Sequence, residues 1–130
     1  MIDTLSHSRR PGVINLLLSL LEDPRPPLAA IQIVAKRSDP RFVHQLLRSI
    51  GEQPSENSAR NLKRAEAIAW ASPGAGVLAK LDDKLQRSAV QVVMASGMPR
   101  LQAFKTIKYL LQHGKPGGRQ SATEALADFQ

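Results

Sequence analysis

Residues that could carry acid–base or metal chemistry are scattered along this chain of 130 residues. His7, His44 and His113 each lie more than 30 residues from the next histidine, and the sequence has no cysteine. Zinc sites usually take several ligands from a short stretch, such as two histidines separated by three residues. We therefore expect no metal site, no disulfide framework and no cysteine nucleophile.

Adjacent carboxylates occur at Glu22-Asp23 and at Asp82-Asp83. Both pairs lie ahead of segments that predict helices, where an acidic side chain stabilises the helix N-terminus. A general acid paired with a general base needs surroundings that separate the two pKa values, and nothing near either pair indicates such burial. We expect these residues to be structural, and an enzyme acting on bases or on a protein-attached cofactor stays only as a third hypothesis.

Two glycine-rich loops, at 74–76 and 114–118, complete the set of candidate chemical sites. Neither has the spacing of a phosphate-binding loop, and neither follows a predicted strand. The second loop places backbone amides and Lys115 at a predicted helix N-terminus, which makes it a candidate anion site. A flexible turn between paired helices is the alternative. We expect no cofactor.

Positive charge is concentrated in the C-terminal half. The chain has 18 Lys and Arg against 11 Asp and Glu, a net +7. The segment from Arg60 to Arg119 holds 11 basic and 3 acidic residues, a net +8, and the other 70 residues hold 7 and 8, a net −1. Such asymmetry is typical of surfaces that bind nucleic acid, anionic lipid or acidic proteins, and also of a solvated face that maintains solubility.

No run of apolar residues reaches the length of about 18 that a transmembrane helix needs, so we expect no membrane contact. The run 13–21, which follows Arg9-Arg10, superficially resembles a secretory leader. It ends in Glu22-Asp23-Pro24 without a small-residue cleavage site. We interpret it as the first helix of a folded, cytoplasmic protein.

Proline and glycine divide the chain into short segments rich in Leu, Ala, Gln, Arg and Lys, which favour helices. Within these segments apolar residues recur at spacings of three and four, and alternating strand patterns are absent. Prolines suit the first turn of a helix, and Gly51, Gly97 and Gly114 suit the position just after its end. The predicted fold class is all-α, with helices at 12–22, 27–37, 40–50, 57–71, 74–80, 83–96, 99–112 and 118–129.

An internal repeat organises these helices. The sequence AIQIV at 30–34 recurs as AVQVV at 89–93, and a proline follows each copy at the same distance. Recurring alanines give a mean period of about 31 residues, and a two-helix unit of that length stacks on its neighbours to bury its apolar face. We predict an α-solenoid (a superhelix) in a single domain, 1–130; a globular helical bundle is the alternative. The four antiparallel helix pairs of the predicted solenoid cover about 11–37, 40–71, 74–96 and 99–129.

The stretches 81–90 and 118–126 resemble the repeats of the HEAT and armadillo-like family. The family pattern has an acidic turn, a branched apolar residue, an arginine and, after two variable positions, an alanine. The chain departs from it where Gln86 replaces the arginine and Gly118 the branched residue, and the first helix of the third repeat is abnormally short. The matching residues are Asp82 or Asp83 for the acid, Leu85 for the apolar residue, Arg119 for the arginine, and Ala89 and Ala122 for the alanine.

The resemblance implies a flexible scaffold whose second helices line a concave surface for protein partners, with no catalytic residues. It also implies that Asp82 or Asp83 pairs with Arg119 or Arg87 between repeats. We therefore expect a non-enzymatic HEAT-like scaffold that binds a protein with an acidic surface through a basic concave face. The candidate partner-binding residues lie in or beside the predicted second helices; they are Arg60, Lys63, Arg64, Lys84, Arg87 and Arg119.

Nucleic acid is the alternative partner, because phosphate contacts need only such charges. A surface that handles DNA usually adds aromatic side chains that stack on bases, and this chain has one Trp and one Tyr. Trp70 lies between two alanines in a predicted helix, so we expect it to be a core residue.

The first helix is apolar over an arc of about 200°, with Asn15 and Ser19 on the narrow polar side. A terminal repeat should instead expose one polar face. We expect residues 1–10, a partner, or a second copy of the chain in a homodimer to cover this helix. The chain also stops at 126–130 without a capping glycine, which favours the N-terminal part of a longer array.

Overall fold

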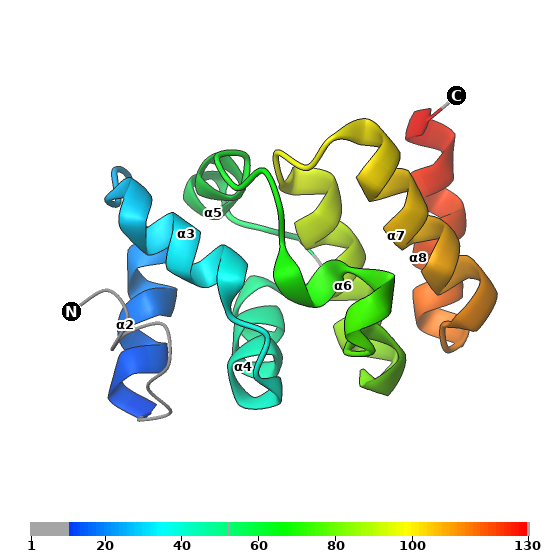
Figure 1. Cartoon of the computed structure of the whole chain (residues 1–130), viewed down its shortest axis with the longest axis horizontal. Coiled ribbons are helices and arrows are strands. Elements are labelled where there is room, and N and C mark those ends of the chain that lie inside the picture. The colour runs from blue at the N-terminus through cyan, green and yellow to red at the C-terminus, as the bar shows by residue number, and fades with distance from the viewer. Residues whose placement is uncertain (1–10, 52, 130) are drawn as a thin grey trace.

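The computed structural model describes residues 11–51 and 53–129, and every regular element in these ranges is helical (Figure 1). The all-α class predicted from the sequence is therefore confirmed. The α-helices are α2 (Pro11–Glu22), α3 (Leu28–Lys36), α4 (Pro40–Ile50), α5 (Glu56–Leu62), α6 (Asp83–Ala95), α7 (Arg100–His113) and α8 (Pro116–Leu126). The 3₁₀ helices are η1 (Ala69–Ala71), η2 (Pro73–Ala75), η3 (Leu78–Lys80) and η4 (Ala127–Phe129).

The helix ends follow from local chemistry. The side chain of Asp39 accepts a hydrogen bond from the Phe42 amide at the start of α4, and Gly51 ends that helix with a φ of 66°. Asp82 caps α6 in the same way through the Leu85 amide, at 2.8 Å. These residue types satisfy backbone groups that a helix end leaves unpaired. The predicted helices that match α2, α3, α4, α6, α7 and α8 are accordingly correct to within three residues at each end.

One predicted helix is too long, and another is absent. The helix predicted at 57–71 ends at Leu62, and the one predicted at 74–80 is replaced by the short turns η2 and η3. The chain leaves the helical path because the Ala65 carbonyl accepts a hydrogen bond from the Gly97 amide at 2.8 Å. Ile68 is then extended, with φ −130° and ψ 112°. A helix through these residues would use the Ala65 carbonyl internally and would lose this contact with the α6–α7 turn.

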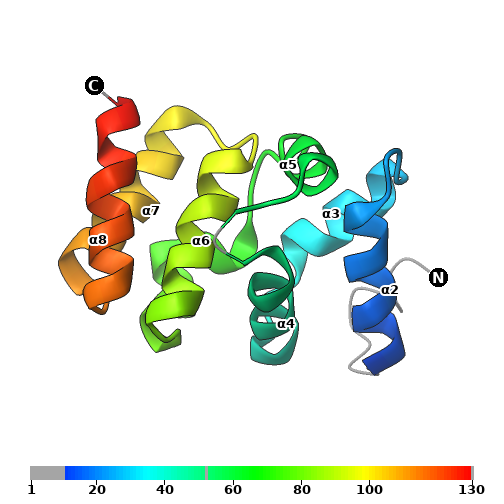
Figure 2. The ribbon, with the colours of Figure 1, turned by 180° about the vertical axis from the view of Figure 1, so that it is seen from behind.

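Helices α2, α4, α6 and α8 lie side by side, and we call them the first row (Figure 2). Helix α3, the turns η1 to η3 and helix α7 form the second row, which faces the viewer in Figure 1. Helix α5 packs on both α2 and α6. The second helices of the four predicted pairs are α3, α5, α6 and α8, so they do not share one row. The second helix of the first pair lies in the second row, whereas the second helices of the third and fourth predicted pairs lie in the first row. This exchange of rows occurs where the third pair lacks its first helix.

A continuous hydrophobic core runs between the rows, from Ile14 in α2 to Ala125 in α8. Trp70 is fully buried in it, as predicted. Ala89 and Ala122 are also fully buried, as expected for small residues that let helices approach closely. The first and last described helices, α2 and α8, lie at opposite ends of the molecule (Figure 1).

Glycine makes the approach of α6 and α8 closer still. Gly117 and Gly118 open α8 and are buried. A Cβ atom at Gly117 would lie 2.9 Å from the Cβ of Asp83, and one at Gly118 would lie 2.7 Å from the Cβ of Gln86. Real Cβ contacts are longer than this, so larger residues cannot take these two positions without moving α8.

Candidate interaction surface

The six candidate residues lie on or just after three helices, of which α6 contacts both α5 and α8. Arg60 is on α5, and Lys63 and Arg64 follow its end. Lys84 and Arg87 are in the first two turns of α6, and Arg119 is in the first turn of α8. All are exposed except Arg87, which is half-buried.

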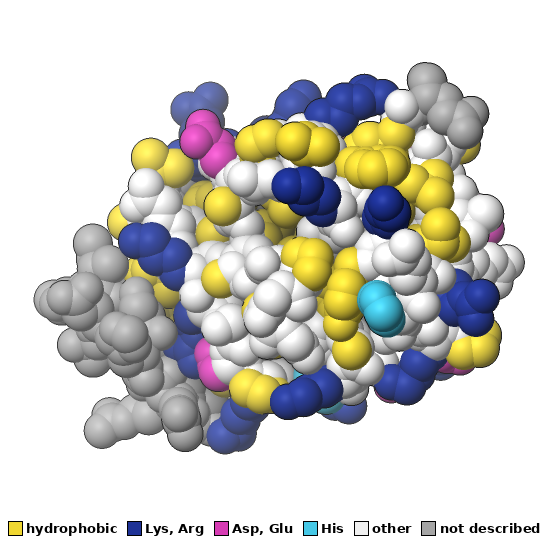
Figure 3. Space-filling view, turned by 45° about the vertical axis from the view of Figure 1, so that its right-hand side comes forward, with side chains coloured by type: hydrophobic (Ala, Val, Ile, Leu, Met, Phe, Trp, Pro, Cys, Tyr) yellow, Lys and Arg dark blue, Asp and Glu magenta, His cyan; other side chains and the backbone are white. Residues whose placement is uncertain are grey.

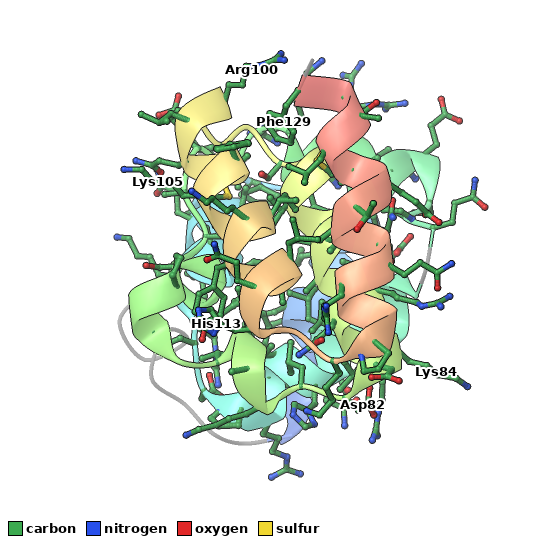
Figure 4. The ribbon with its side chains drawn as sticks, turned by 90° about the vertical axis from the view of Figure 1, so that its right-hand side faces the viewer. Asp82, Lys84, Arg100, Lys105, His113 and Phe129 are labelled. Carbon is green, nitrogen blue, oxygen red and sulfur yellow. The ribbon has the colours of Figure 1, made fainter. Side chains whose placement is uncertain are left out.

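The structure divides these residues into two groups. Gly97, just beyond the C-terminal end of α6, contacts the backbone of Lys63 and Ala65, so the α5 group lies beside that end. Lys84 and Arg87 are at the opposite end of α6, where Lys84 and Asp82 appear together in Figure 4. A helix of 13 residues is about 20 Å long. The six cations therefore do not form one continuous stripe.

Three of the candidates take part in the fold. Arg64 Nη1 donates to the Pro26 carbonyl at 3.0 Å, which ties the end of α5 to the α2–α3 turn. Arg87 Nη2 donates to Gln120 Oε1 at 2.9 Å and links α6 to α8. Arg60 pairs with Glu56 at 3.5 Å, and an ion pair as exposed as this one contributes little stability.

The remaining three candidates face solvent. The side-chain nitrogens of Lys63, Lys84 and Arg119 make no hydrogen bond or ion pair within residues 11–51 and 53–129. Their charges are therefore available to a partner.

The other motifs predicted from the sequence have structural roles. Lys115 Nζ donates to the Leu81 carbonyl at 2.6 Å, and this favours the turn over an anion site at 114–118. Glu22 accepts hydrogen bonds from Ser55 Oγ at 2.8 Å and from Ser58 Oγ at 2.5 Å, so it anchors the α2–α3 turn to α5. Among the described residues, no three His, Asp or Glu side chains gather as they would for a metal ion.

Gln86, which stands where the HEAT and armadillo-like pattern would have arginine, is fully buried between three elements. Its Nε2 donates to the Leu78 carbonyl at 3.0 Å, and its Oε1 accepts from the Lys115 amide at 2.8 Å. It therefore joins η3, α6 and the α7–α8 turn. The neutral amide fills the space that the glycines of α8 leave open.

Asp39, in the α3–α4 turn, lies away from the candidates and has a lowered pKa. Burial acts to raise the pKa of the Asp39 carboxyl. The hydrogen bond and the charge of Arg37, together with the hydrogen bond from the Phe42 amide, outweigh burial, so the pKa of Asp39 is lowered. Arg37 Nε lies 2.9 Å from Asp39 Oδ1, and its guanidinium stacks 5.2 Å from the centre of the Phe42 ring. This arrangement fixes the α3–α4 turn.

Two adjoining hollows on the second row have no counterpart among the sites predicted from the sequence. One, of about 390 Å³, lies between the end of α3 and α7 over residues 67–73. The other, of about 320 Å³, continues along α3 toward Leu28. They share Ala35, Lys36 and Ala67, so we treat them as one feature, the α3–α7 groove. Figure 3 shows recessed hydrophobic side chains on this face with Lys and Arg side chains around them.

No sequence signal marks this groove, because it exists only where a helix of the second row is missing. Two cations that are not among the six candidates, Lys36 and Lys105, line it beside the candidate Arg64. Lys105 projects from α7 on the side away from α8 (Figure 4).

No helix in the described ranges has both the length and the apolar character needed to span a bilayer. A scan against protein-family models, a search of curated proteins and a search of solved structures each give no match to the chain.

Proposed function

We propose that this chain is a non-enzymatic, cytoplasmic HEAT-like scaffold that binds a protein partner with an acidic surface. The observation that carries the proposal is the exposed positive charge of the C-terminal half. The segment from Arg60 to Arg119 holds 11 basic and 3 acidic residues, and its basic residues are all exposed except the half-buried Arg87. An uncompensated field of this kind attracts acidic surfaces and accelerates their association.

The arrangement of the helices supports a repeat scaffold. Each helix of the first row packs on the next, and the ends of the row lie far apart, as in a stacked array whose units contact only their neighbours. We propose that the rows form a short α-solenoid of about four helix pairs, interrupted in the third.

Two observations favour a protein partner over nucleic acid. Proteins that follow a nucleic-acid backbone use a continuous basic track, whereas the candidate cations here form two groups at opposite ends of α6. The aromatic side chains that could stack on bases pack within the fold, and the half-buried ring of Tyr109 lies 4.9 Å, centre to centre, from that of His113. Trp70 and Phe42 are fully buried, and Phe104 packs against Phe129 with ring centres 5.7 Å apart.

A binding titration tests the proposal. The probes are a labelled polyglutamate peptide and labelled single-stranded and duplex DNA, each titrated with the chain at several salt concentrations. We expect polyglutamate to bind more tightly than either DNA at about 0.15 M salt, and its affinity to fall as salt rises. Tighter binding of DNA would overturn the proposal in favour of the nucleic-acid alternative. Binding of none of the probes at low salt would overturn both.

Charge-reversal variants locate the surface. We expect Lys84→Glu combined with Arg119→Glu to weaken polyglutamate binding about tenfold, because both side chains are exposed and free of partners in the described structure. The matched control is Arg25→Glu combined with Arg41→Glu, two exposed arginines of the N-terminal half. Equal losses in both double variants would contradict a localised surface.

A further inference from the structure

The α3–α7 groove has an apolar floor and walls. Ile31 and Ile68 lie beneath it and are almost fully buried, while Met98 is half-buried in its wall. The side chain of Leu28, at its far end, is 50% exposed, which is unusual for so large an apolar residue. Covering this surface would remove apolar area from water, which is the main driving force of protein association.

The groove exists because the third helix pair is incomplete. Between α3 and α7 the second row holds only 3₁₀ turns, and these contact both helices. The residues exposed there have small side chains, including Ala67, Ala69 and Ser72. These small residues leave a hollow between the end of α3 and α7, and its second part follows α3 toward Leu28.

The rim of the groove is positively charged. Lys36 in the last turn of α3, Lys105 on α7 and Arg64 stand around it, against the single acid Glu66. The ammonium groups of Lys36 and Lys105 have no hydrogen-bond or ion-pair partner in the part of the chain that the structure describes. Acidic side chains on either side of an apolar ridge would complement this pattern.

The groove also favours one backbone conformation for its occupant. An extended peptide needs partners for its own amides and carbonyls, and it usually finds them on the edge of a sheet. None of the described residues forms a strand, and Thr106 in the groove wall already donates its hydroxyl to the Ala71 carbonyl at 3.0 Å. A helix satisfies its own backbone and offers apolar side chains one turn apart.

We infer that the α3–α7 groove is the docking site for an acidic amphipathic helix of the partner protein. The apolar face of that helix lies on Ile68, Met98 and Leu28, and its acidic flanks meet Lys36 and Lys105. This inference rests on the proposed function, because it names the part of an acidic partner that the scaffold recognises.

The test uses two labelled peptides of about four helical turns, each of about 15 residues. Both contain the same leucines and glutamates. One places the leucines at i, i+3, i+4 and i+7, and the other is scrambled so that no apolar face forms. Binding to the full chain is followed by fluorescence anisotropy at low salt. We expect the amphipathic peptide to bind about tenfold more tightly than the scrambled one.

Two variants of the groove should abolish this difference between the peptides. Ala67→Trp fills both hollows from an exposed position, and Lys36→Glu combined with Lys105→Glu reverses the rim. Each should weaken the amphipathic peptide about tenfold. The controls are Ala127→Trp and Lys108→Glu, which change exposed positions outside the groove. Circular dichroism melting curves would show whether each variant is folded.

The outcomes separate this inference from the proposed function. In the contrary outcome, the two peptides bind equally well, lose binding in the Lys84→Glu and Arg119→Glu double variant, and keep it in Ala67→Trp. This result would overturn the groove as the docking site and would leave the proposed acidic-partner scaffold intact. Failure of both peptides and of polyglutamate to bind would overturn both. Selective loss of the amphipathic peptide in the two groove variants would support both.

Discussion

The α6–α8 junction and the segment 63–81 are built in opposite ways. At the junction two α-helices of 13 and 11 residues pack through alanine and glycine, and Asp82 caps the first of them. The segment 63–81 has three 3₁₀ turns of three residues each. Its order comes from burying Ile68, Trp70 and Leu78 and from its contact with Gly97. Local signals determine the junction, whereas distant contacts determine the segment, and the difference produces the groove.

The largest effect should come from removing the anchor of the irregular segment. Trp70 is fully buried, and its Nε1 has no hydrogen-bond partner among the described residues, so its contribution is packing. Trp70→Ala should lower the free energy of unfolding by about 3–5 kcal/mol, measured by urea denaturation. Trp70→Phe should cost clearly less, because it keeps a ring and removes the unpaired N–H. Similar losses for the two variants would show that packing is not the anchor.

An intermediate effect is expected at the junction. Gly118→Val places a side chain against Gln86, where even a Cβ atom would be too close. The free energy of unfolding should fall by about 1–3 kcal/mol in the same denaturation experiment. Gly74→Ala is the control in the irregular segment, because the nearest atom to its new Cβ would be Ser72 Oγ at 3.9 Å. Should Gly118→Val be as stable as Gly74→Ala, the close approach of α6 and α8 would be disproved.

The smallest effect concerns Asp39, outside both regions, and depends on pH. Because its pKa is lowered in the folded protein, its ion pair and cap stabilise the fold above the unfolded value of 3.8. That stability is lost as the pH falls below this value toward the folded pKa. Asp39→Asn should therefore cost about 1 kcal/mol at neutral pH, and the difference from the unmodified chain should shrink below about pH 4. A difference independent of pH would contradict the ion pair.

The sequence predicted those parts of the fold that short-range chemistry encodes. Asp39, Gly51 and Asp82 mark helix ends, and spacings of three and four mark the buried faces, so most of the helices were found. The break after Leu62 was missed because it depends on a hydrogen bond between Ala65 and Gly97, which lie far apart in the chain.

The candidate site was predicted only in part, for the same reason. Charge excess is visible in composition, and Arg60, Lys63, Arg64, Lys84, Arg87 and Arg119 do lie on neighbouring helices. The candidates fall into two groups, and Lys36 and Lys105 line the same groove. Both features depend on how the helices are distributed between the two rows. No motif in the sequence records that distribution.

The buried contacts of Gln86 should be insensitive to ionic strength. Salt bridges between exposed charges weaken as dissolved ions screen them, whereas hydrogen bonds of a buried neutral amide do not. Because Gln86 is a neutral amide, the tie between η3, α6 and the α7–α8 turn carries no charge. We therefore expect α6, η3 and the α7–α8 turn to stay packed at salt concentrations that screen the exposed charges of Lys84 and Arg119, so that salt can weaken binding at these cations without unfolding the helices that carry them.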